Sequence, residues 1–210
     1  MRKTLSILLS TFVVITFIAS CAQTEEGTKE ETKKESVVAD KLIPPTEPYV
    51  MDENPHLVIE TELGEMVVEL YLKESPMTAS NFLYLVNQEF YNGLMWHRVI
   101  PGFVIQGGDP QGTGMGGPGY MIDFEENDMK HEPGAMAMAR SRDPNSAGSQ
   151  FYIALKELPQ LDAGGYCVFG KLVSGLDVAQ KIAAVERNNR DKPLEDVHII
   201  KIYEKKSFTD

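Results

Sequence analysis

The sequence predicts a mainly β protein: a closed, eight-stranded antiparallel β-barrel capped by two α-helices. Short runs of β-branched and aromatic residues are separated by turn residues, which is typical of antiparallel strands with tight connections. Two other segments, one early and one late, repeat apolar residues at helical spacing and are suited to closing the ends of a barrel. A barrel filled with Val, Ile, Leu and Phe has no room for a ligand, so we expect functional residues on its outer face.

Residues 1–20 are predicted to be a lipoprotein signal peptide. Arg2 and Lys3 precede an apolar run, residues 5–18, that is short for a membrane span and ends at small residues. The segment Ile18-Ala19-Ser20-Cys21 resembles the bacterial lipobox, in which cleavage leaves a lipid-carrying cysteine at the new N-terminus. We therefore expect lipid attachment at Cys21 and an extracytoplasmic protein on a bacterial cell membrane or outer membrane. A plain signal peptide with an incidental cysteine is the alternative.

Residues 21–54 are predicted to be a disordered tether that follows the lipid-bearing cysteine. Glu, Lys, Thr and Pro dominate this segment, and large apolar residues are almost absent before Tyr49, so it cannot bury a core. Its expected role is to hold a folded domain away from the membrane. We expect that domain at residues 55–206, and we expect it to be a monomer.

The net charge and the positions of the His and Cys residues argue against a nucleic-acid partner, a metal site and an internal disulfide. The formal net charge is −11, which makes nucleic acid an improbable partner because phosphate binding needs a basic face. The four histidines are tens of residues apart, without Cys or acidic neighbours at ligand spacing, so no metal site is predicted. Cys167 has no partner for an internal disulfide once Cys21 carries lipid, and a buried, inert thiol is expected.

The strands and helices of the domain follow from local patterns. A hairpin opens the domain, and Ser75-Pro76 then predicts an N-cap and first residue of a helix whose apolar positions are 79, 82, 83 and 86. The glycine-rich segment 112–119 formally matches a dinucleotide fingerprint but lacks the flanking strand and helix, so we interpret it as a surface loop. The remaining predictions are strands at 56–61, 66–71, 135–139, 150–155, 166–173 and 197–203, and a second helix at 176–185.

The segment 95–109 predicts a second hairpin with unusual contents. Pro101-Gly102 has the residues that a type II turn prefers, and the flanking runs look like strand. Arg98 and Gln106 lie inside these otherwise apolar runs, and their polar ends need a partner or a purpose. In the structural alternative, Arg98 pairs with a carboxylate and Gln106 caps a sheet edge.

This segment resembles the central motif of the cyclophilins, a family of peptidyl-prolyl cis-trans isomerases. Trp96 to Asp109 matches the family pattern almost without interruption. Two further blocks follow in the family's order, so the resemblance covers roughly residues 56–203. They are Ala137-Met138-Ala139-Arg140 with Asn145 to Ile153, and Leu161-Asp162 with Tyr166 to Lys171.

The resemblance implies both an activity and a set of site residues. It implies a peptidyl-prolyl cis-trans isomerase that acts on unfolded or flexible proline-containing polypeptides and needs no cofactor. The catalytic residues that it implies are Arg98, Phe103 and Gln106. The substrate-binding residues that it implies are His97, Val104, Ala139, Arg140, Ser141, Tyr152, Gln160, Leu161 and Tyr166.

Several of these positions depart from the best-known family pattern. Val104 replaces a Met, Tyr152 a Phe, Gln160 a Trp and Tyr166 a His. Because the family's Trp packs against cyclosporin, Gln160 predicts weak cyclosporin binding. Strict alternation along the strand places Phe103 and Gln106 on opposite faces, so a bulge near the turn is expected to bring them together.

The chemistry of the reaction favours Arg98 as the catalytic group. Rotation about an X-Pro bond crosses a barrier of about 18–20 kcal/mol because twisting breaks the partial double bond. A donor aimed at the prolyl nitrogen is satisfied only when that nitrogen becomes pyramidal, so it stabilises the twisted state selectively. The function predicted from the sequence is X-Pro isomerisation in extracytoplasmic protein folding. The alternative is a non-catalytic module of the same fold that binds proline-containing segments as a chaperone or adhesion partner.

Overall fold

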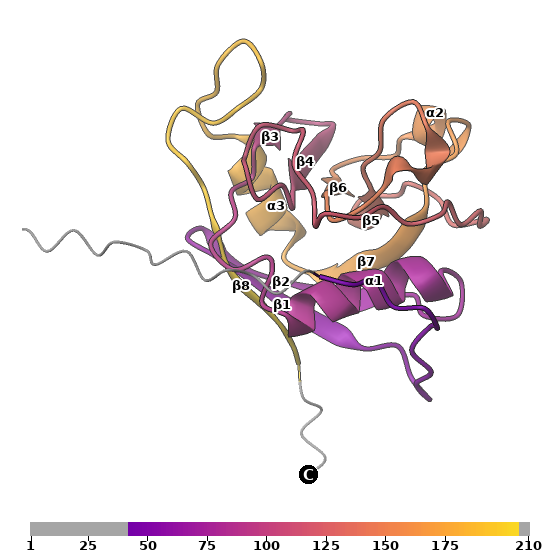
Figure 1. Cartoon of the computed structure of the whole chain (residues 1–210). Helices are drawn as coiled ribbons and strands as arrows, with labels where there is room; N and C mark the ends of the chain where they lie inside the picture. Colours follow the sequence, from indigo (N-terminus) through magenta and orange to yellow (C-terminus); the bar gives the residue numbers. More distant parts are fainter. Residues whose placement is uncertain (1–41, 206–210) are drawn as a thin grey trace, which may run out of the picture. The chain divides into compact units, whose positions relative to one another are not determined.

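Eight antiparallel strands form one curled sheet in the computed structural model, which describes residues 42–205 (Figure 1). The strand order is β3-β4-β6-β5-β7-β2-β1-β8. The strands are β1 (His56–Thr61), β2 (Gly64–Leu70), β3 (Arg98–Val99), β4 (Val104–Gly107), β5 (Ala135–Met138), β6 (Phe151–Ala154), β7 (Val168–Ser174) and β8 (Ile199–Glu204). Each predicted strand is present, with bounds that differ by a few residues.

The sheet is open, whereas the sequence predicted a closed barrel. Its edge strands β3 and β8 are not paired with each other. The segments just before them meet at one isolated bridge, between Met95 and His198, with Trp96 N–H donating to the Val197 carbonyl at 2.9 Å. Gly93 N–H also donates to the Ile199 carbonyl, and Ile199 N–H to the Leu94 carbonyl, both at 2.7 Å. Because β3 has only two residues, the sheet is joined here by a few hydrogen bonds rather than along a strand pair.

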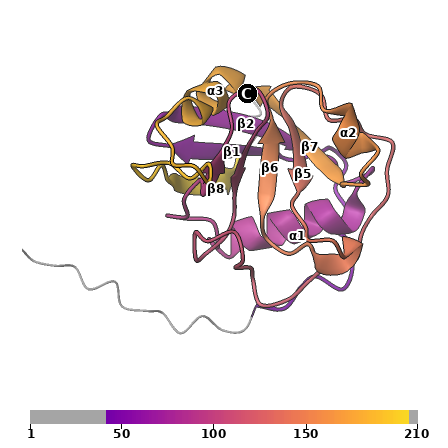
Figure 2. The same cartoon turned by 90° about the horizontal axis from the view of Figure 1, so that it is seen from above.

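Two longer helices and two short ones complete the described part of the chain. The longer helices are α1 (Pro76–Asn87) and α3 (Leu176–Ala183), as predicted. Helix α1 contacts β7 and β8, and α3 contacts β2 and β4; Figure 2 shows α1 running across the strands. The one-turn helix α2 (Pro159–Asp162) and the 3-10 helix η1 (Pro144–Ser146) were not predicted.

The N-terminus of α1 is held by a residue that the sequence analysis did not select. Ser75 occupies the predicted N-cap position, but its hydroxyl donates to the Val168 carbonyl at 2.9 Å instead of capping the helix. The carboxylate of Glu125 accepts from the backbone N–H of Met77 at 2.9 Å and of Thr78 at 2.6 Å. A carboxylate in that position also interacts favourably with the helix dipole. The loop before β5 is thereby fastened to α1.

The two faces of the sheet carry separate apolar clusters. Along β6, Phe151 and Ile153 belong to the larger core, whereas Tyr152 and Ala154 belong to a smaller cluster on the opposite face. The larger core is rich in aromatic pairs, including Phe82 with Phe151 at 5.1 Å between ring centroids. The alternation along β6 therefore sends Tyr152 to the outer face, where functional residues were expected.

Residues 42–54, which the sequence assigned to the end of the tether, contact the domain. They form neither helix nor strand. Leu42 packs against the larger core, and Tyr49 N–H donates to Ser80 on α1 at 2.7 Å. The predicted signal peptide and Cys21 lie outside the described residues and stay predictions. None of the helices in residues 42–205 has the length and apolar content that a membrane crossing requires.

Candidate active site

The hairpin of β3 and β4 contains the expected turn and the expected bulge. Phe103 N–H donates to the Ile100 carbonyl at 3.0 Å across Pro101-Gly102, and Gly102 has the positive φ of 67° that a type II turn requires. Ile100 N–H donates in turn to the Val104 carbonyl at 2.9 Å, so Ile100 is opposite both Phe103 and Val104. Two residues opposite one is the geometry of a bulge next to the turn; from Val104 on, β4 pairs regularly with its neighbours.

The strand register places three of the predicted site residues side by side. Arg98 on β3 is paired with Gln106 on β4, and Gln106 is paired with Tyr152 on β6. Directly paired residues of antiparallel strands project to the same face. Arg98, Gln106 and Tyr152 therefore form one row across the outer face of the sheet.

This row borders a cavity of about 210 Å³, which we call the Arg98 pocket. It brings together most of the predicted site residues. The residues that line it are Arg98, Phe103, Val104, Gln106, Ala139, Arg140, Tyr152, Leu161 and Tyr166. Aromatic and aliphatic side chains form most of its wall, and the polar side chains of Arg98, Gln106 and Arg140 complete it. That combination suits a small apolar ring attached to a polar backbone.

A larger cavity of about 580 Å³, which we call the glycine-loop groove, shares Gln106, Ala139 and Arg140 with the Arg98 pocket. The glycine-rich segment 114–119 and Ser141 form other parts of its wall. The two cavities are therefore contiguous.

The guanidinium group of Arg98 has no carboxylate partner within residues 42–205, and no hydrogen bond to the rest of that segment. It lies over the Phe103 ring, with 5.9 Å between the guanidinium carbon and the ring centroid. Arg98 is half-buried, and its donors remain available to a ligand. The structural alternative, in which Arg98 serves an ion pair, has no support in the described part of the chain.

Gln106 is oriented by a relay from the glycine-rich loop. Its side-chain amide donates to Gln150 at 2.9 Å, and the Gln150 amide donates to the Gly116 carbonyl at 2.8 Å. This fixes the rotamer of Gln106 and leaves its second amide hydrogen and its carbonyl oxygen for a ligand. Gln150 belongs to the second block of the family motif, but the sequence did not predict this role for it.

The same loop is organised by Asp109, which is 1% exposed. Its carboxylate accepts from the backbone N–H groups of Gln111 at 2.7 Å, Thr113 at 2.9 Å and Gly114 at 2.6 Å. Burial alone would raise the pKa of Asp109, but the backbone donors outweigh burial and lower that pKa. The segment 112–119 is therefore a loop built around a carboxylate.

Arg140 has a role that the sequence did not reveal. Its guanidinium donates to the carbonyls of Gly164 at 2.6 Å and Gly165 at 3.1 Å and lies over the Tyr166 ring. Arg140 therefore holds the segment between α2 and β7 in place, and with it Tyr166 at the pocket wall. The guanidinium N–H groups of Arg140 already donate hydrogen bonds, whereas those of Arg98 donate none within residues 42–205.

Three predicted site residues lie outside the Arg98 pocket. Ser141 lines the glycine-loop groove, and Gln160 is exposed on α2. His97 is 6% exposed, and neither ring nitrogen has a hydrogen-bond partner in the described part of the chain. Burial lowers the pKa of His97, which favours the neutral ring. The substrate-binding roles of these three residues remain predictions.

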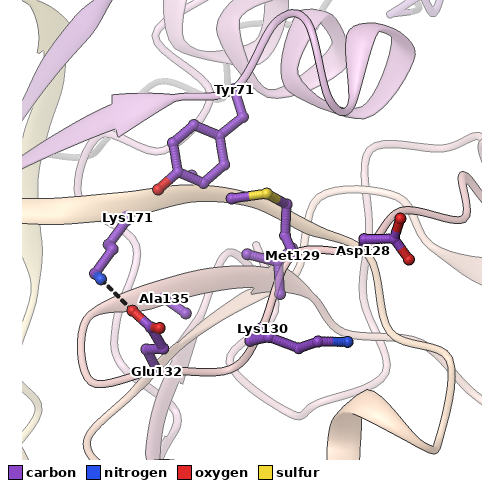
Figure 3. A pocket seen from close by; sticks show the side chains of 9 residues that line it. Tyr71, Asp128, Met129, Lys130, Glu132, Ala135 and Lys171 are labelled. Atoms are coloured by element: carbon purple, nitrogen blue, oxygen red, sulfur yellow. Dashed lines mark hydrogen bonds and ion pairs between the residues drawn. The ribbon is translucent and has the colours of Figure 1, made fainter.

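Another cavity of about 210 Å³ contains none of the predicted site residues (Figure 3). Tyr71 and Met129 lie on one side of it, and the ion pair of Lys171 and Glu132, 2.5 Å apart, lies on another.

Within residues 42–205, no group of three or more His, Cys, Asp or Glu side chains is arranged to hold a metal ion.

Comparisons with known proteins agree with this geometry. Residues 56–204 match the family model described as cyclophilin type peptidyl-prolyl cis-trans isomerase/CLD. The human peptidyl-prolyl cis-trans isomerase-like 1 is 42% identical over 154 residues, which is 71% of this chain and 92% of the relative. The fission yeast isomerase ppi1 is 43% identical over 148 residues, or 68% and 94% of the two chains.

A solved structure shares the fold. The crystal structure of a Cryptosporidium parvum cyclophilin-type isomerase, determined in the presence of the dipeptide Ala-Pro, superposes with a TM-score of 0.69 at 36% identity. The match covers 72% of this chain and 99% of that one. The sequence match, the shared sheet and the pocket beside Arg98 lead to one conclusion: the chain belongs to the cyclophilin-type peptidyl-prolyl cis-trans isomerases.

Proposed function

We propose that this isomerase accelerates X-Pro isomerisation in proteins that fold outside the cytoplasm, and that lipid on Cys21 anchors it to a bacterial membrane. The isomerase activity follows from the family, whereas the location is our extension. It is supported by the basic residues, apolar run and lipobox-like segment at residues 1–21. A single acyl chain gives only marginal membrane binding, so the anchor needs more than one chain on this cysteine.

The proposed catalytic step is a rotation that forms and breaks no covalent bond. The proline ring sits in the Arg98 pocket, against Phe103, Val104, Tyr152 and Leu161. As the amide twists, the prolyl nitrogen becomes pyramidal and regains a lone pair, and Arg98 donates to it. This hydrogen bond exists only in the twisted state, so it lowers the barrier without tightening ground-state binding.

The observation that carries this role is the guanidinium of Arg98, which has no hydrogen bond or ion pair within residues 42–205 and lies beside a mainly apolar pocket. A module that only held proline segments would need no donor aimed at the prolyl nitrogen. Gln106 is positioned to bind a backbone carbonyl of the substrate, and Ala139, Arg140 and Ser141 border the path of the preceding residues. The substrates are unfolded or flexible proline-containing chains, and the enzyme acts as a monomer.

Two experiments test the proposal. NMR exchange spectroscopy on a short X-Pro peptide is expected to show catalytic exchange between cis and trans with the purified domain. In the native host, mass spectrometry is expected to find acyl chains on the N-terminal Cys21, and Cys21→Ser is expected to leave uncleaved precursor. If Cys21 carries no acyl chain, the proposed membrane anchor is wrong, but the assignment of isomerase activity is not affected.

A further inference from the structure

A buried chain of hydrogen bonds leads away from the Arg98 pocket through a histidine. The Tyr152 hydroxyl lies 2.8 Å from Nε2 of His131, and Nδ1 of His131 lies 2.6 Å from Oδ1 of Asp162. His131 is 2% exposed, and its ring is stacked on that of Tyr152 with an interplanar angle of 12°. Neither His131 nor Asp162 was among the site residues predicted from the sequence.

The direction of the hydrogen bonds follows from the charges. Burial alone would raise the pKa of Asp162, but the hydrogen bonds from His131 outweigh burial and lower that pKa, so the carboxylate is ionised. It therefore accepts from Nδ1–H, and in the tautomer with its proton on Nδ1 the ring presents Nε2 to Tyr152 as an acceptor. Burial also raises the pKa of Tyr152, so the phenol keeps its proton and donates to Nε2.

The main chain of His131 fastens α2 independently of its side chain. The backbone N–H of Leu158 donates to the His131 carbonyl at 2.9 Å, and the backbone N–H of His131 donates to Asp162 Oδ1 at 2.9 Å. Neither bond uses the imidazole ring, so we expect both to remain after a conservative substitution at position 131. Substitutions there therefore isolate the contribution of the imidazole ring.

We propose that His131 is a positioning residue for proline binding, because it takes up the hydroxyl of Tyr152 and keeps that wall of the Arg98 pocket apolar. A phenol in an apolar pocket needs a hydrogen-bond partner. Without Nε2 the hydroxyl must recruit water or turn toward the ligand, and either change weakens contact with a proline ring. The inference rests on the Arg98 pocket being the proline site.

Two conservative substitutions separate the two bonds of the ring. His131→Gln places an amide near the position of Nε2 and keeps a partner for Tyr152, whereas His131→Asn reaches only the position of Nδ1 and keeps the bond to Asp162. We expect His131→Asn to raise the Kd of an X-Pro peptide about tenfold, which corresponds to the loss of one buried hydrogen bond. The Kd of His131→Gln for the same peptide is expected to remain within about threefold of the wild-type value.

The same two substitutions are then made in a Tyr152→Phe variant. With the hydroxyl removed, the Asn and Gln variants are expected to bind the peptide equally well. An equal weakening by His131→Asn in both backgrounds would overturn the proposal, because it would indicate a purely structural role. So would a Gln variant that binds no better than the Asn variant in the Tyr152 background.

A matched control is available at the surface. His198 also directs its backbone N–H and Nδ1 at one carboxylate, that of Glu62, at 2.9 and 3.1 Å, but it lies outside both cavities. His198→Asn is expected to leave the Kd unchanged. The thermal midpoints of all variants identify any variant that does not fold. If His131→Asn does not fold, the Kd of His131→Gln, which keeps the buried bond to Tyr152, is compared with that of wild type. Wild-type protein without exchange activity would instead refute the proposed function.

Discussion

The guanidinium carbon of Arg140 lies 4.4 Å from the centroid of the Tyr166 ring. This stacking, together with the bonds to Gly164 and Gly165, connects the end of β5 to the segment that carries Tyr166. One wall of the Arg98 pocket is thus held in place by Arg140.

Arg140→Met is therefore expected to weaken substrate binding without abolishing catalysis. The methionine preserves bulk but removes the donors to both carbonyls, so Tyr166 loses its fixed position. We expect the free energy of unfolding to fall by about 1 kcal/mol, since the hydrogen bonds are partly exposed to water. Urea unfolding and peptide Kd measure the two effects. An unchanged Kd with reduced stability would mean that Tyr166 is held by other contacts.

Arg98→Ala is expected to remove most catalysis while the fold persists. Loss of one transition-state donor typically costs about 3–4 kcal/mol, or a hundred- to a thousandfold in rate. Arg98→Lys should restore little, because an ammonium lacks the planar fork of a guanidinium. The measurements are kcat/KM on an X-Pro peptide and the thermal midpoint.

The exposed Arg190 is the control for the loss of an arginine, and Arg190→Ala should leave kcat/KM unchanged. Near-wild-type activity in folded Arg98→Ala would refute the catalytic role. Loss of activity together with loss of fold would instead make Arg98 a structural residue.

Asp109→Asn is expected to destabilise the glycine-rich loop in a pH-dependent manner. The folded-state pKa of Asp109 lies below its usual value of 3.8 because its backbone donors outweigh burial. A carboxylate with a lowered pKa contributes stability above its unfolded-state pKa, and this contribution is lost as pH falls through the folded-state pKa. We expect the variant to be about 1–3 kcal/mol less stable at neutral pH, and the difference to shrink below about pH 4.

Urea unfolding at neutral and acidic pH tests this linkage. Asp52→Asn, at an exposed position without a side-chain hydrogen bond in the described part of the chain, is the control and should show no such trend. A gap between wild type and Asp109→Asn that stays constant across the pH range would contradict the assigned role of the charge.

Cyclosporin is expected to inhibit this protein weakly. The family's Trp contributes a large apolar face with an N–H donor on a rigid ring, whereas Gln160 has amide N–H donors but lacks that apolar face. Gln160 is exposed on α2, so Gln160→Trp can be introduced without disturbing the core. We expect this substitution to strengthen inhibition at least about tenfold, as burial of an indole allows. Tight inhibition of the unmodified protein would show that another residue has taken over the contact.

Local patterns in the sequence were sufficient to predict the strands, the two longer helices and the turn at Pro101-Gly102. These features depend on alternation, helical spacing and turn chemistry within a few residues, so they can be predicted without knowledge of the fold. The family motif likewise identified the residues of the Arg98 pocket. The bulge that brings Phe103 beside Gln106 was expected because strict alternation left them on opposite faces.

Other features were decided only by the tertiary structure, because they join residues far apart in the chain. Glu125, rather than the adjacent Ser75, caps α1 from 47 and 48 residues away. His131 meets Tyr152 across 21 residues, and Arg140 meets Gly165 across 25. The open edge between β3 and β8 likewise depends on how far the whole sheet curls. No local propensity encodes these contacts, since each forms only when the curvature of the sheet and the packing of its loops bring the partners together.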